Sequence, residues 1–278
     1  MALTLTKVGH SVREQNGRQL ILPPNPPKNL VNLRMPDIET PSTLQLYPLG
    51  TIFREGDRSY RYAKASGGQI PDVGSQIGSH QHVENCAVQA NYAAGVTTIT
   101  ITTASTAGAA HNGLIAEDEL YGGYIVVFPA GGNKAFVRQI IGNSACTISQ
   151  ANTCTIKLDR PTPVAITTSD TAECMASPYL NVITGANERR AVVGVPACVA
   201  TTGQYFWLQT WGPCWCATEA NLGNSANNIG AKWRYNGTLQ TADDADAYHE
   251  CQQYAGFVLS FAYAGTQGAP FVWLQIAY

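Results

Sequence analysis

The clearest evidence for the fold class is the segment Val96-Thr-Thr-Ile-Thr-Ile-Thr-Thr103. Within it, Ile99 and Ile101 alternate with threonines, which places both isoleucines on one face of an extended chain. Isoleucine and threonine are β-branched and suit the pleated surface of a sheet. The pattern predicts a half-buried β-strand.

The same alternation recurs downstream and predicts a hairpin. Residues 124–128 and 134–140 are rich in apolar side chains. They flank Pro129-Ala-Gly-Gly-Asn133, whose residues favour a turn and tolerate positive φ. We therefore expect two antiparallel strands joined by this loop.

A second hairpin is predicted directly afterwards. Residues 146–149 and 154–158 flank Gln150-Ala-Asn152, and Cys146 and Cys154 are symmetric about the first residue of that loop. We expect two thiols that face a core. A cross-strand disulfide is the alternative, because this register would bring the two cysteines together.

The last third of the chain contains three more apolar segments with strand character, at residues 205–210, 256–263 and 271–276. Between them, residues 217–250 are rich in Asn, Gly, Ala and Asp and predict a long excursion or a small subdomain. These patterns together predict an all-β protein with a β-sandwich or barrel body and at most one or two short helices.

Only one segment has a helical rhythm. Its small and apolar residues recur at spacings of three and four within residues 80–94, and they are Val83, Cys86, Ala87 and Ala90. We expect one short helix there.

Residues 1–45 predict an extended arm. Six prolines lie in this segment, and each removes a backbone donor: Pro23, Pro24, Pro26, Pro27, Pro36 and Pro41. An extended arm buries little of itself, so we take the first four of these prolines as candidate partner contacts, with a loose terminus as the alternative. The body then spans residues 46–278, with two candidate subdomains at about residues 46–190 and 191–278.

Composition excludes several classes of protein. Charged residues make up 13% of the 278 residues, about half the usual share. The net charge of -2 gives no basic footprint for nucleic acid, and no segment has the roughly 20 consecutive apolar residues of a membrane span. The first residues lack the features of a secretory signal, so we expect synthesis in the cytoplasm.

Motifs of catalysis and metal binding are also missing. The sequence has no nucleophile elbow, phosphate-binding loop or zincin helix, and its eight cysteines include no CxxC pair. His80 and His82 would share one strand face and could hold a metal, but no third ligand lies near them. We therefore expect no metal, no cofactor and no enzyme.

Two acidic groups have a functional and a simpler interpretation. Asp243, Asp244 and Asp246 could gather around calcium, although a solvated acidic turn is the simpler explanation. Residues 117–119 (Glu-Asp-Glu) could be imagined as a glycosidase pair, but adjacent carboxylates rarely flank a scissile bond. We expect both groups to be surface charge.

Tryptophans and tyrosines offer a different surface chemistry, because aromatic rings can stack on sugar rings. Trp207 and Trp273 lie in the middle of predicted strands, so we expect them in the core. Trp233 and Tyr235, in Lys232-Trp-Arg-Tyr235, are the candidates for an exposed contact with a partner or a glycan.

Residues 46–67 read Leu-Tyr-Pro-Leu-Gly-Thr-Ile-Phe-Arg-Glu-Gly-Asp-Arg-Ser-Tyr-Arg-Tyr-Ala-Lys-Ala-Ser-Gly. This segment resembles a signature of uncharacterised structural proteins of tailed bacteriophages. Members of that family have Leu-Gly-Thr, Gly-Asp-Arg and Tyr-Arg-Tyr-Ala-Lys-Ala in this order. Three later segments are similar to the same family, at residues 121–127, 193–200 and 204–214. The resemblance carries no catalytic residue to this chain.

This resemblance implies a role in the virion, as a cement or decoration subunit on the exterior of the capsid that binds the major capsid protein and stabilises the shell. Low charge and many small or hydroxylated side chains suit a subunit with large buried contacts. Cement subunits cluster at symmetry axes, so we expect a homotrimer. The alternative is a tail or receptor-binding subunit that recognises host glycan.

Overall fold

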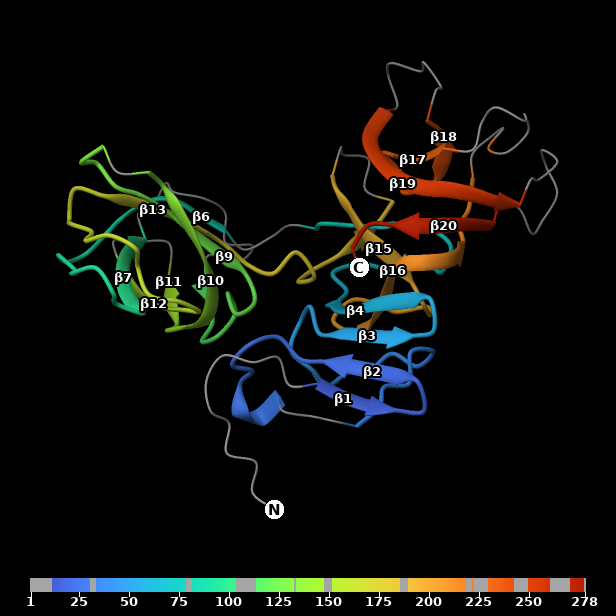
Figure 1. The fold of residues 1–278 in the computed structure, drawn as a ribbon, viewed down its shortest axis with the longest axis horizontal. Coiled ribbons are helices and arrows are strands. Elements are labelled where there is room, and N and C mark those ends of the chain that lie inside the picture. Colours follow the sequence, from blue (N-terminus) through green and yellow to red (C-terminus); the bar gives the residue numbers. More distant parts are fainter. Residues whose placement is uncertain are drawn as a thin grey trace. The chain divides into compact units, whose positions relative to one another are not determined.

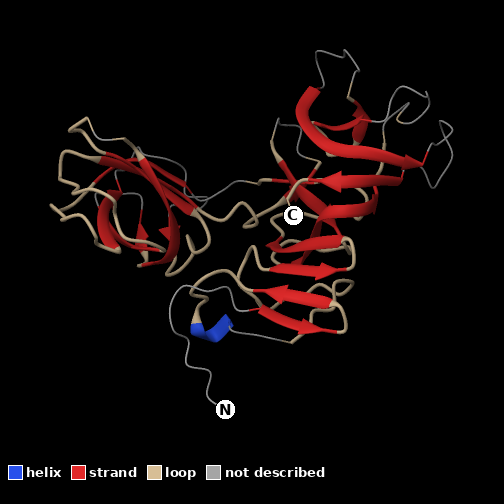
Figure 2. Ribbon diagram, viewed as in Figure 1, coloured by secondary structure: helices blue, strands red, loops and turns tan. Residues whose placement is uncertain are grey.

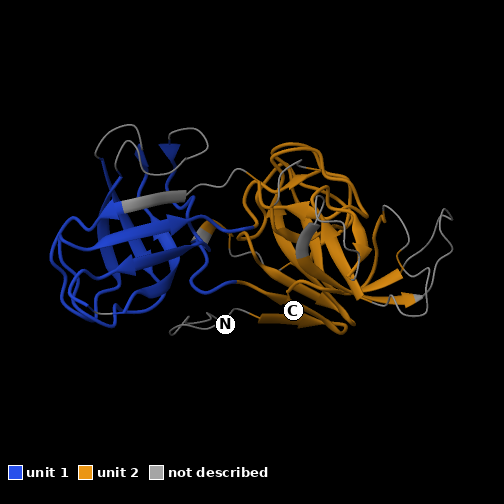
Figure 3. Cartoon of the chain, turned by 90° about the horizontal axis from the view of Figure 1, so that it is seen from above, with its two compact units in different colours: residues 1–11, 23–27, 79–178 blue, residues 12–22, 28–78, 179–278 orange. Residues whose placement is uncertain are grey.

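The computed structural model describes residues 12–30, 34–78, 82–103, 114–132, 134–147, 152–185, 190–218, 222, 230–242, 250–260 and 271–277. Within these residues the prediction of an all-β protein is confirmed. Figure 2 shows strands throughout and one short helix, the 3₁₀ helix η1 at Lys28–Leu30. The chain forms two compact units, drawn in two colours in Figure 3.

Unit 1 comprises residues 1–11, 23–27 and 79–178. Its strands are β6 (His82–Ala87), β7 (Thr98–Thr103), β8 (Leu114–Ile115), β9 (Tyr124–Phe128), β10 (Phe136–Asn143), β11 (Cys146–Thr147), β12 (Asn152–Leu158) and β13 (Thr171–Met175). Six of them form an antiparallel sheet in the order β6-β13-β9-β10-β12-β7 (Figure 1). A bridge between Val88 and Ile101 joins the two ends of this sheet, so unit 1 is a small closed barrel.

The barrel interior is filled by alternate residues of its strands. In β7, Ile99 and Ile101 are buried while the intervening Thr100 is partly exposed, which confirms the half-buried strand predicted from Val96–Thr103. Opposite them on β12, Ile156 and Cys154 are buried as well. The predicted hairpin at Pro129–Asn133 is also confirmed, because β9 pairs with β10 in antiparallel register.

Unit 2 comprises residues 12–22, 28–78 and 179–278. Its strands are β1 (Val12–Gln15), β2 (Arg18–Ile21), β3 (Ile52–Glu55), β4 (Arg58–Lys64), β5 (Ser75–Gln76), β14 (Ile183–Thr184), β15 (Val192–Pro196), β16 (Tyr205–Trp215), β17 (Gly230–Arg234), β18 (Leu239–Thr241), β19 (Glu250–Ser260) and β20 (Phe271–Gln275). They form one sheet whose main order is β1-β2-β3-β4-β16-β20-β19-β17-β18. The curled end of this sheet, β16 to β18, resembles an incomplete barrel (Figure 1).

β16 organises unit 2, because it pairs with β4 along its first half and with β20 along its second half. A register shift in the β4–β16 pairing lies between Gln209 and Trp211, and the next residue, Gly212, has a φ of 88°. A Cβ atom at this glycine would lie 2.1 Å from the carbonyl oxygen of Asp57. Glycine is required here because the backbone of the 57–58 turn comes so close to β16.

The predicted helix at residues 80–94 is wrong. Residues 82–87 form β6, which pairs with β13. Cys86 and Val88 are buried and Ala87 between them is exposed, which is the period of a strand. The spacing of three between Val83 and Cys86 fits this strand because an irregularity in the β6–β13 pairing adds one residue to β6 between them.

The predicted second hairpin is also wrong. Cys146 in β11 pairs with Ile115 of β8, whereas β12 pairs with β10 and β7. The buried Asn143 explains this path, because its side chain accepts a hydrogen bond from Leu120 N and donates to Ala116 O and Ser144 O. These bonds hold the end of β10 against the 116–120 turn and direct the chain toward β8.

The expected arm and domain boundaries differ from the structure. Residues 12–21 form the hairpin β1–β2, and β2 pairs with β3 of the body. Pro23, Pro24, Pro26 and Pro27 are partly buried in unit 1, where the hydroxyl of Tyr121 donates a hydrogen bond to the carbonyl of Pro24. The chain therefore passes into unit 1 and back within residues 22–28, enters unit 1 again after residue 78, and returns to unit 2 after residue 178 in place of a boundary near residue 190.

Candidate functional site

An aromatic cluster lies on the β4–β16 pair of unit 2. The antiparallel register places Tyr62 opposite Trp207, with ring centroids 5.0 Å apart. Tyr47 packs at 5.2 Å from Tyr62 and 5.5 Å from Trp207. Tyr205 stacks on Tyr62 at 5.9 Å, and the Lys64 ammonium lies 5.6 Å from the Tyr205 ring. Alternation along the two strands thus gathers three rings on one face of the sheet, and Tyr47 packs on them from the chain before β3.

These rings form the floor of a depression of about 490 Å³. Its lining residues are Arg34, Met35, Pro36, Asp37, Thr40, Pro41, Ser42, Leu46, Tyr47, Tyr62, Tyr205 and Trp207. One wall is the 34–46 segment, which is held to the sheet by reciprocal backbone hydrogen bonds between Ser42 and Tyr205. The hydroxyl of Tyr47 donates to Arg34 O at 2.6 Å, which secures the start of the same wall.

This depression combines neutral phenol groups with charged side chains. Burial raises the pKa values of Tyr47 and Tyr62, so both phenols are neutral at ordinary pH. A side-chain hydrogen bond from Thr40 lowers the pKa of Asp37, which therefore stays ionised at the rim. The described lining residues offer the edges of largely buried rings, the Arg34 guanidinium and the Asp37 carboxylate, which suits a partner with apolar and polar groups.

The wall segment exposes two apolar side chains, which we call the apolar rim: Leu46 lines the depression, and Leu44 lies two residues before it. Leu44 is 70% exposed and Leu46 is 42% exposed. The backbone amide of Leu46 donates to the Tyr62 hydroxyl at 3.1 Å, so this part of the rim is fixed on the aromatic floor. A fixed, exposed apolar rim around an aromatic floor is typical of an interaction surface.

A second aromatic surface lies on the outer face of β16, β20 and β19. The register pairs Trp215 with Phe271, and Trp273 with Phe257. The Phe257 and Trp273 rings are nearly parallel, with centroids 6.2 Å apart. Trp215 and Phe271 are exposed, while Trp273 is partly exposed.

Of the three tryptophans whose place the sequence predicted, one lies where it was expected. Trp207 is buried as predicted, but Trp273 is partly exposed on the outer face instead of in the core. Trp233 is fully buried within a hydrophobic core of unit 2, so its predicted exposed role is wrong. Tyr235 is partly buried, and its carbonyl accepts a hydrogen bond from Gln76. The signal for the exposed face was the alternation of Phe271 and Trp273 with aliphatic residues in β20.

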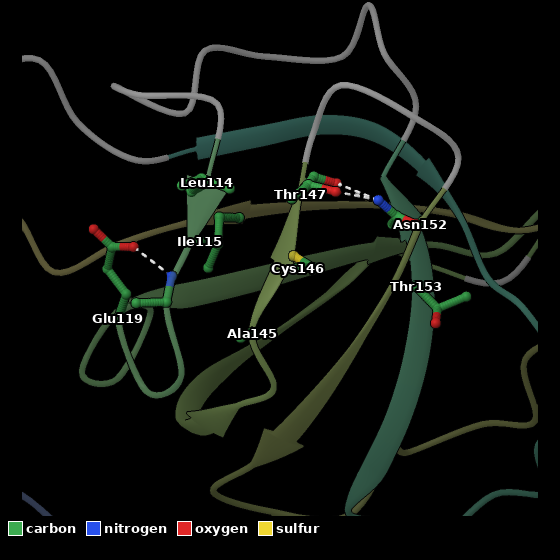
Figure 4. Close-up of a pocket in the computed structure, with 9 residues that line it drawn as sticks. Leu114, Ile115, Glu119, Ala145, Cys146, Thr147, Asn152 and Thr153 are labelled. Atoms are coloured by element: carbon green, nitrogen blue, oxygen red, sulfur yellow. Dashed lines mark hydrogen bonds between the residues drawn. The ribbon is translucent and has the colours of Figure 1, made fainter.

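A depression in unit 1 surrounds Cys146 (Figure 4). It has a volume of about 620 Å³ and is lined by Leu114, Ile115, Ala116, Glu119, Ala145, Cys146, Thr147, Asn152 and Thr153. Figure 4 shows Glu119 at one end, Asn152 and Thr147 hydrogen-bonded at the other, and the Cys146 sulfur between them. Cys154, which is not part of the lining, is buried in the barrel.

The acidic turn at residues 117–119 has a structural role. The Glu119 carboxylate accepts a hydrogen bond from the backbone of Ala116 at 2.8 Å, and the Asp118 carboxylate accepts one from Asn143 at 3.3 Å. The Glu119 carboxylate thus satisfies a donor of its own turn, and the Asp118 carboxylate joins the turn to β10. Glu117 and Asp118 are exposed, as the surface-charge interpretation expects. His80, the side chain of His82 and all three of Asp243, Asp244 and Asp246 lie outside the described residues.

Among the side chains that the structure describes, no group of three or more His, Cys, Asp and Glu residues could hold a metal ion. In the same part of the chain, no helix has the length and apolar character needed to cross a membrane. Comparisons with family models, with curated proteins and with solved structures find no match to this chain.

Proposed function

We propose that this protein is a bacteriophage virion structural protein, a cement or decoration subunit on the capsid exterior that binds the major capsid protein. One observation carries the proposal. The segment that resembles phage head proteins, residues 46–67, includes β3 and β4 and supplies Tyr47 and Tyr62 to the aromatic floor. The most specific part of the sequence therefore coincides with an interaction surface.

The energetics of the rim support the same proposal. Leu44 and Leu46 expose apolar area to water, and burial against a partner removes it at roughly 25 cal/mol per Å². A cement subunit binds only the assembled shell, so this free energy stabilises the assembled state by mass action. Low overall charge also suits a subunit that is covered over much of its surface.

Capsids that lack this protein provide the test. Purified protein is incubated with such capsids, and binding is measured by cosedimentation and particle imaging. We expect saturable binding at regular lattice positions. Absence of capsid binding by the folded wild-type protein would overturn the proposal, and sedimentation velocity tests the proposed trimer separately.

Two sets of variants locate the contact. Leu44→Asp with Leu46→Asp places charge on the exposed rim without disturbing the core, and we expect binding at least about tenfold weaker. Val137→Asp is the matched control, because Val137 is 50% exposed and lies in unit 1. Equal binding by both variants would show that the contact lies elsewhere.

A second candidate function is host-glycan recognition by a tail or receptor-binding subunit. The outer face of β16, β20 and β19 favours it, because exposed rings in register can stack on sugar rings. We expect Trp215→Ala and Phe271→Ala to reduce binding to host cells if this candidate is correct. Phe128→Ala is the control, since Phe128 is equally exposed but lies on β9 of unit 1.

A further inference from the structure

Cys146 and Cys154 form a contacting pair of thiols in unit 1. Both are free, and they lie on β11 and β12, which follow each other along the chain and belong to different sheets. The Cys154 thiol is within hydrogen-bonding reach of the Cys146 sulfur and of Ser144 O, which is 3.3 Å away. The two sulfurs differ in accessibility, because Cys146 lines the depression and Cys154 is 1% exposed.

We propose that Cys146 and Cys154 are a redox-active pair, in which Cys146 reacts with a small-molecule disulfide from the depression and Cys154 completes an intramolecular disulfide. This inference stands independently of the proposed function. It adds a modification site and names its reactant by chemical class.

The reaction has two balanced steps of thiol–disulfide exchange. The Cys146 thiolate attacks one sulfur of the small disulfide, forms a mixed disulfide and releases one small thiolate. Cys154 then loses its proton and attacks the Cys146 sulfur, and the second small thiolate leaves. The protein is oxidised by two electrons, and the reagent is reduced to two thiols.

The environment of each sulfur favours this order. The hydrogen bond from Cys154 lowers the pKa of Cys146, because it stabilises the thiolate, although burial and the nearby Glu119 carboxylate oppose this effect. The same hydrogen bond, together with burial, raises the pKa of Cys154. Cys146 is thus the sulfur that is both ionisable and open to a reagent.

The other barrel thiols differ from Cys146. Cys86 and Cys174 are buried, and burial raises the pKa of Cys86 to about 12 and that of Cys174 well above its usual value. A thiol without thiolate character reacts slowly with disulfides and alkylating agents. They therefore provide an internal reference for the reactivity of Cys146.

The cross-link would join β11 to β12 and close the chain between residues 146 and 154. Reducing cytoplasm keeps such a pair as thiols, and an oxidising exterior favours the disulfide. We therefore expect the barrel of unit 1 to be held more tightly outside a cell than inside it.

The test uses the reduced full-length protein and oxidised glutathione, followed by peptide mapping without reduction. We expect wild type to gain a Cys146–Cys154 disulfide. Cys154→Ser is expected to stop at a mixed disulfide between Cys146 and glutathione, and Cys146→Ser to leave Cys154 as a thiol. Cys198→Ser, a buried cysteine of unit 2, is the control and should behave like wild type.

Any of three results in wild type would overturn the proposal: an unmodified Cys146, a mixed disulfide that persists, or a disulfide from Cys146 to another cysteine. If a serine variant fails to fold, alkylation of the folded wild type decides instead. We expect iodoacetamide to modify Cys146 at least about tenfold faster than Cys86 or Cys174. Equal rates would contradict the assignment of Cys146 as the attacking thiol.

Discussion

Tyr62 and Trp207 lie directly opposite each other on β4 and β16, and their ring centroids are 5.0 Å apart. Both side chains are 2% exposed, so the pair belongs to the core while its edges form the floor of a depression. Tyr47, which follows the wall segment 34–46 in the chain, contacts both rings. The stability of unit 2 and the shape of its candidate interaction surface therefore depend on the same residues.

Trp207→Ala should lower the free energy of unfolding by about 3–5 kcal/mol, because it leaves a cavity among three aromatic rings. Tyr62→Phe should lower the free energy of unfolding by only about 1 kcal/mol, because it removes only the hydrogen bond that the Tyr62 hydroxyl accepts from Leu46 N. Denaturant unfolding followed by circular dichroism measures both. Trp215→Ala is the control, since this exposed ring at the end of β16 should cost less than about 1 kcal/mol. A larger loss for Trp215→Ala than for Trp207→Ala would contradict the assignment of the core.

Gly212→Ala should destabilise the protein by about 3 kcal/mol or more, because a Cβ atom would lie 2.1 Å from Asp57 O in addition to the strain of positive φ. Gly203→Ala isolates the second effect. Gly203 has a φ of 85°, and nothing lies within 4 Å of its Cβ position, so we expect a loss of about 1–2 kcal/mol. Thermal and denaturant unfolding of the two variants gives the comparison. Equal losses would mean that backbone strain alone accounts for the glycine.

Asn143→Ala should destabilise the barrel of unit 1 by about 2–4 kcal/mol, because it removes three hydrogen bonds from a buried site. Amide hydrogen exchange at Leu120 provides a local measurement, since its N–H loses its acceptor. Asn91→Ala is the matched control: its amide oxygen accepts one exposed hydrogen bond from Thr168 N, and we expect a loss below about 1 kcal/mol. Unchanged exchange at Leu120 in Asn143→Ala would argue against this role.

Alkaline pH should destabilise the protein through Tyr60. Burial raises the pKa of Tyr60 to about 12, against the usual value near 10 in the unfolded chain. The folded state therefore binds more protons between these values, so this contribution is complete below pH 10 and is lost as pH rises through 12. Tyr60→Phe should match wild type at pH 8 and lose less stability at pH 11. Unfolding curves at both pH values test this, and equal losses at pH 11 would exclude Tyr60 as a source.

Local patterns were sufficient for much of the fold. The alternation of Ile99 and Ile101 with threonine identified β7, and the Pro129–Asn133 loop identified the β9–β10 hairpin. Both predictions succeed because a strand with one buried face must alternate, and a short turn must contain residues that tolerate its φ values. The same reasoning failed for residues 80–94, because an irregularity in the pairing of β6 gives a strand the spacing of three that is otherwise typical of a helix.

The all-β fold class and the low share of charged residues could be predicted from the sequence alone, because side-chain alternation and composition are local properties. Only the tertiary structure decided which aromatic rings are buried and which sulfurs meet. Trp233 is in a core and Trp273 lies on an outer face, although both are in strands. Cys146 meets Cys154 without sharing a hairpin with it. Strands that are distant in the sequence determine these outcomes. A strand has one buried and one exposed face only where other parts of the chain pack against one side of its sheet.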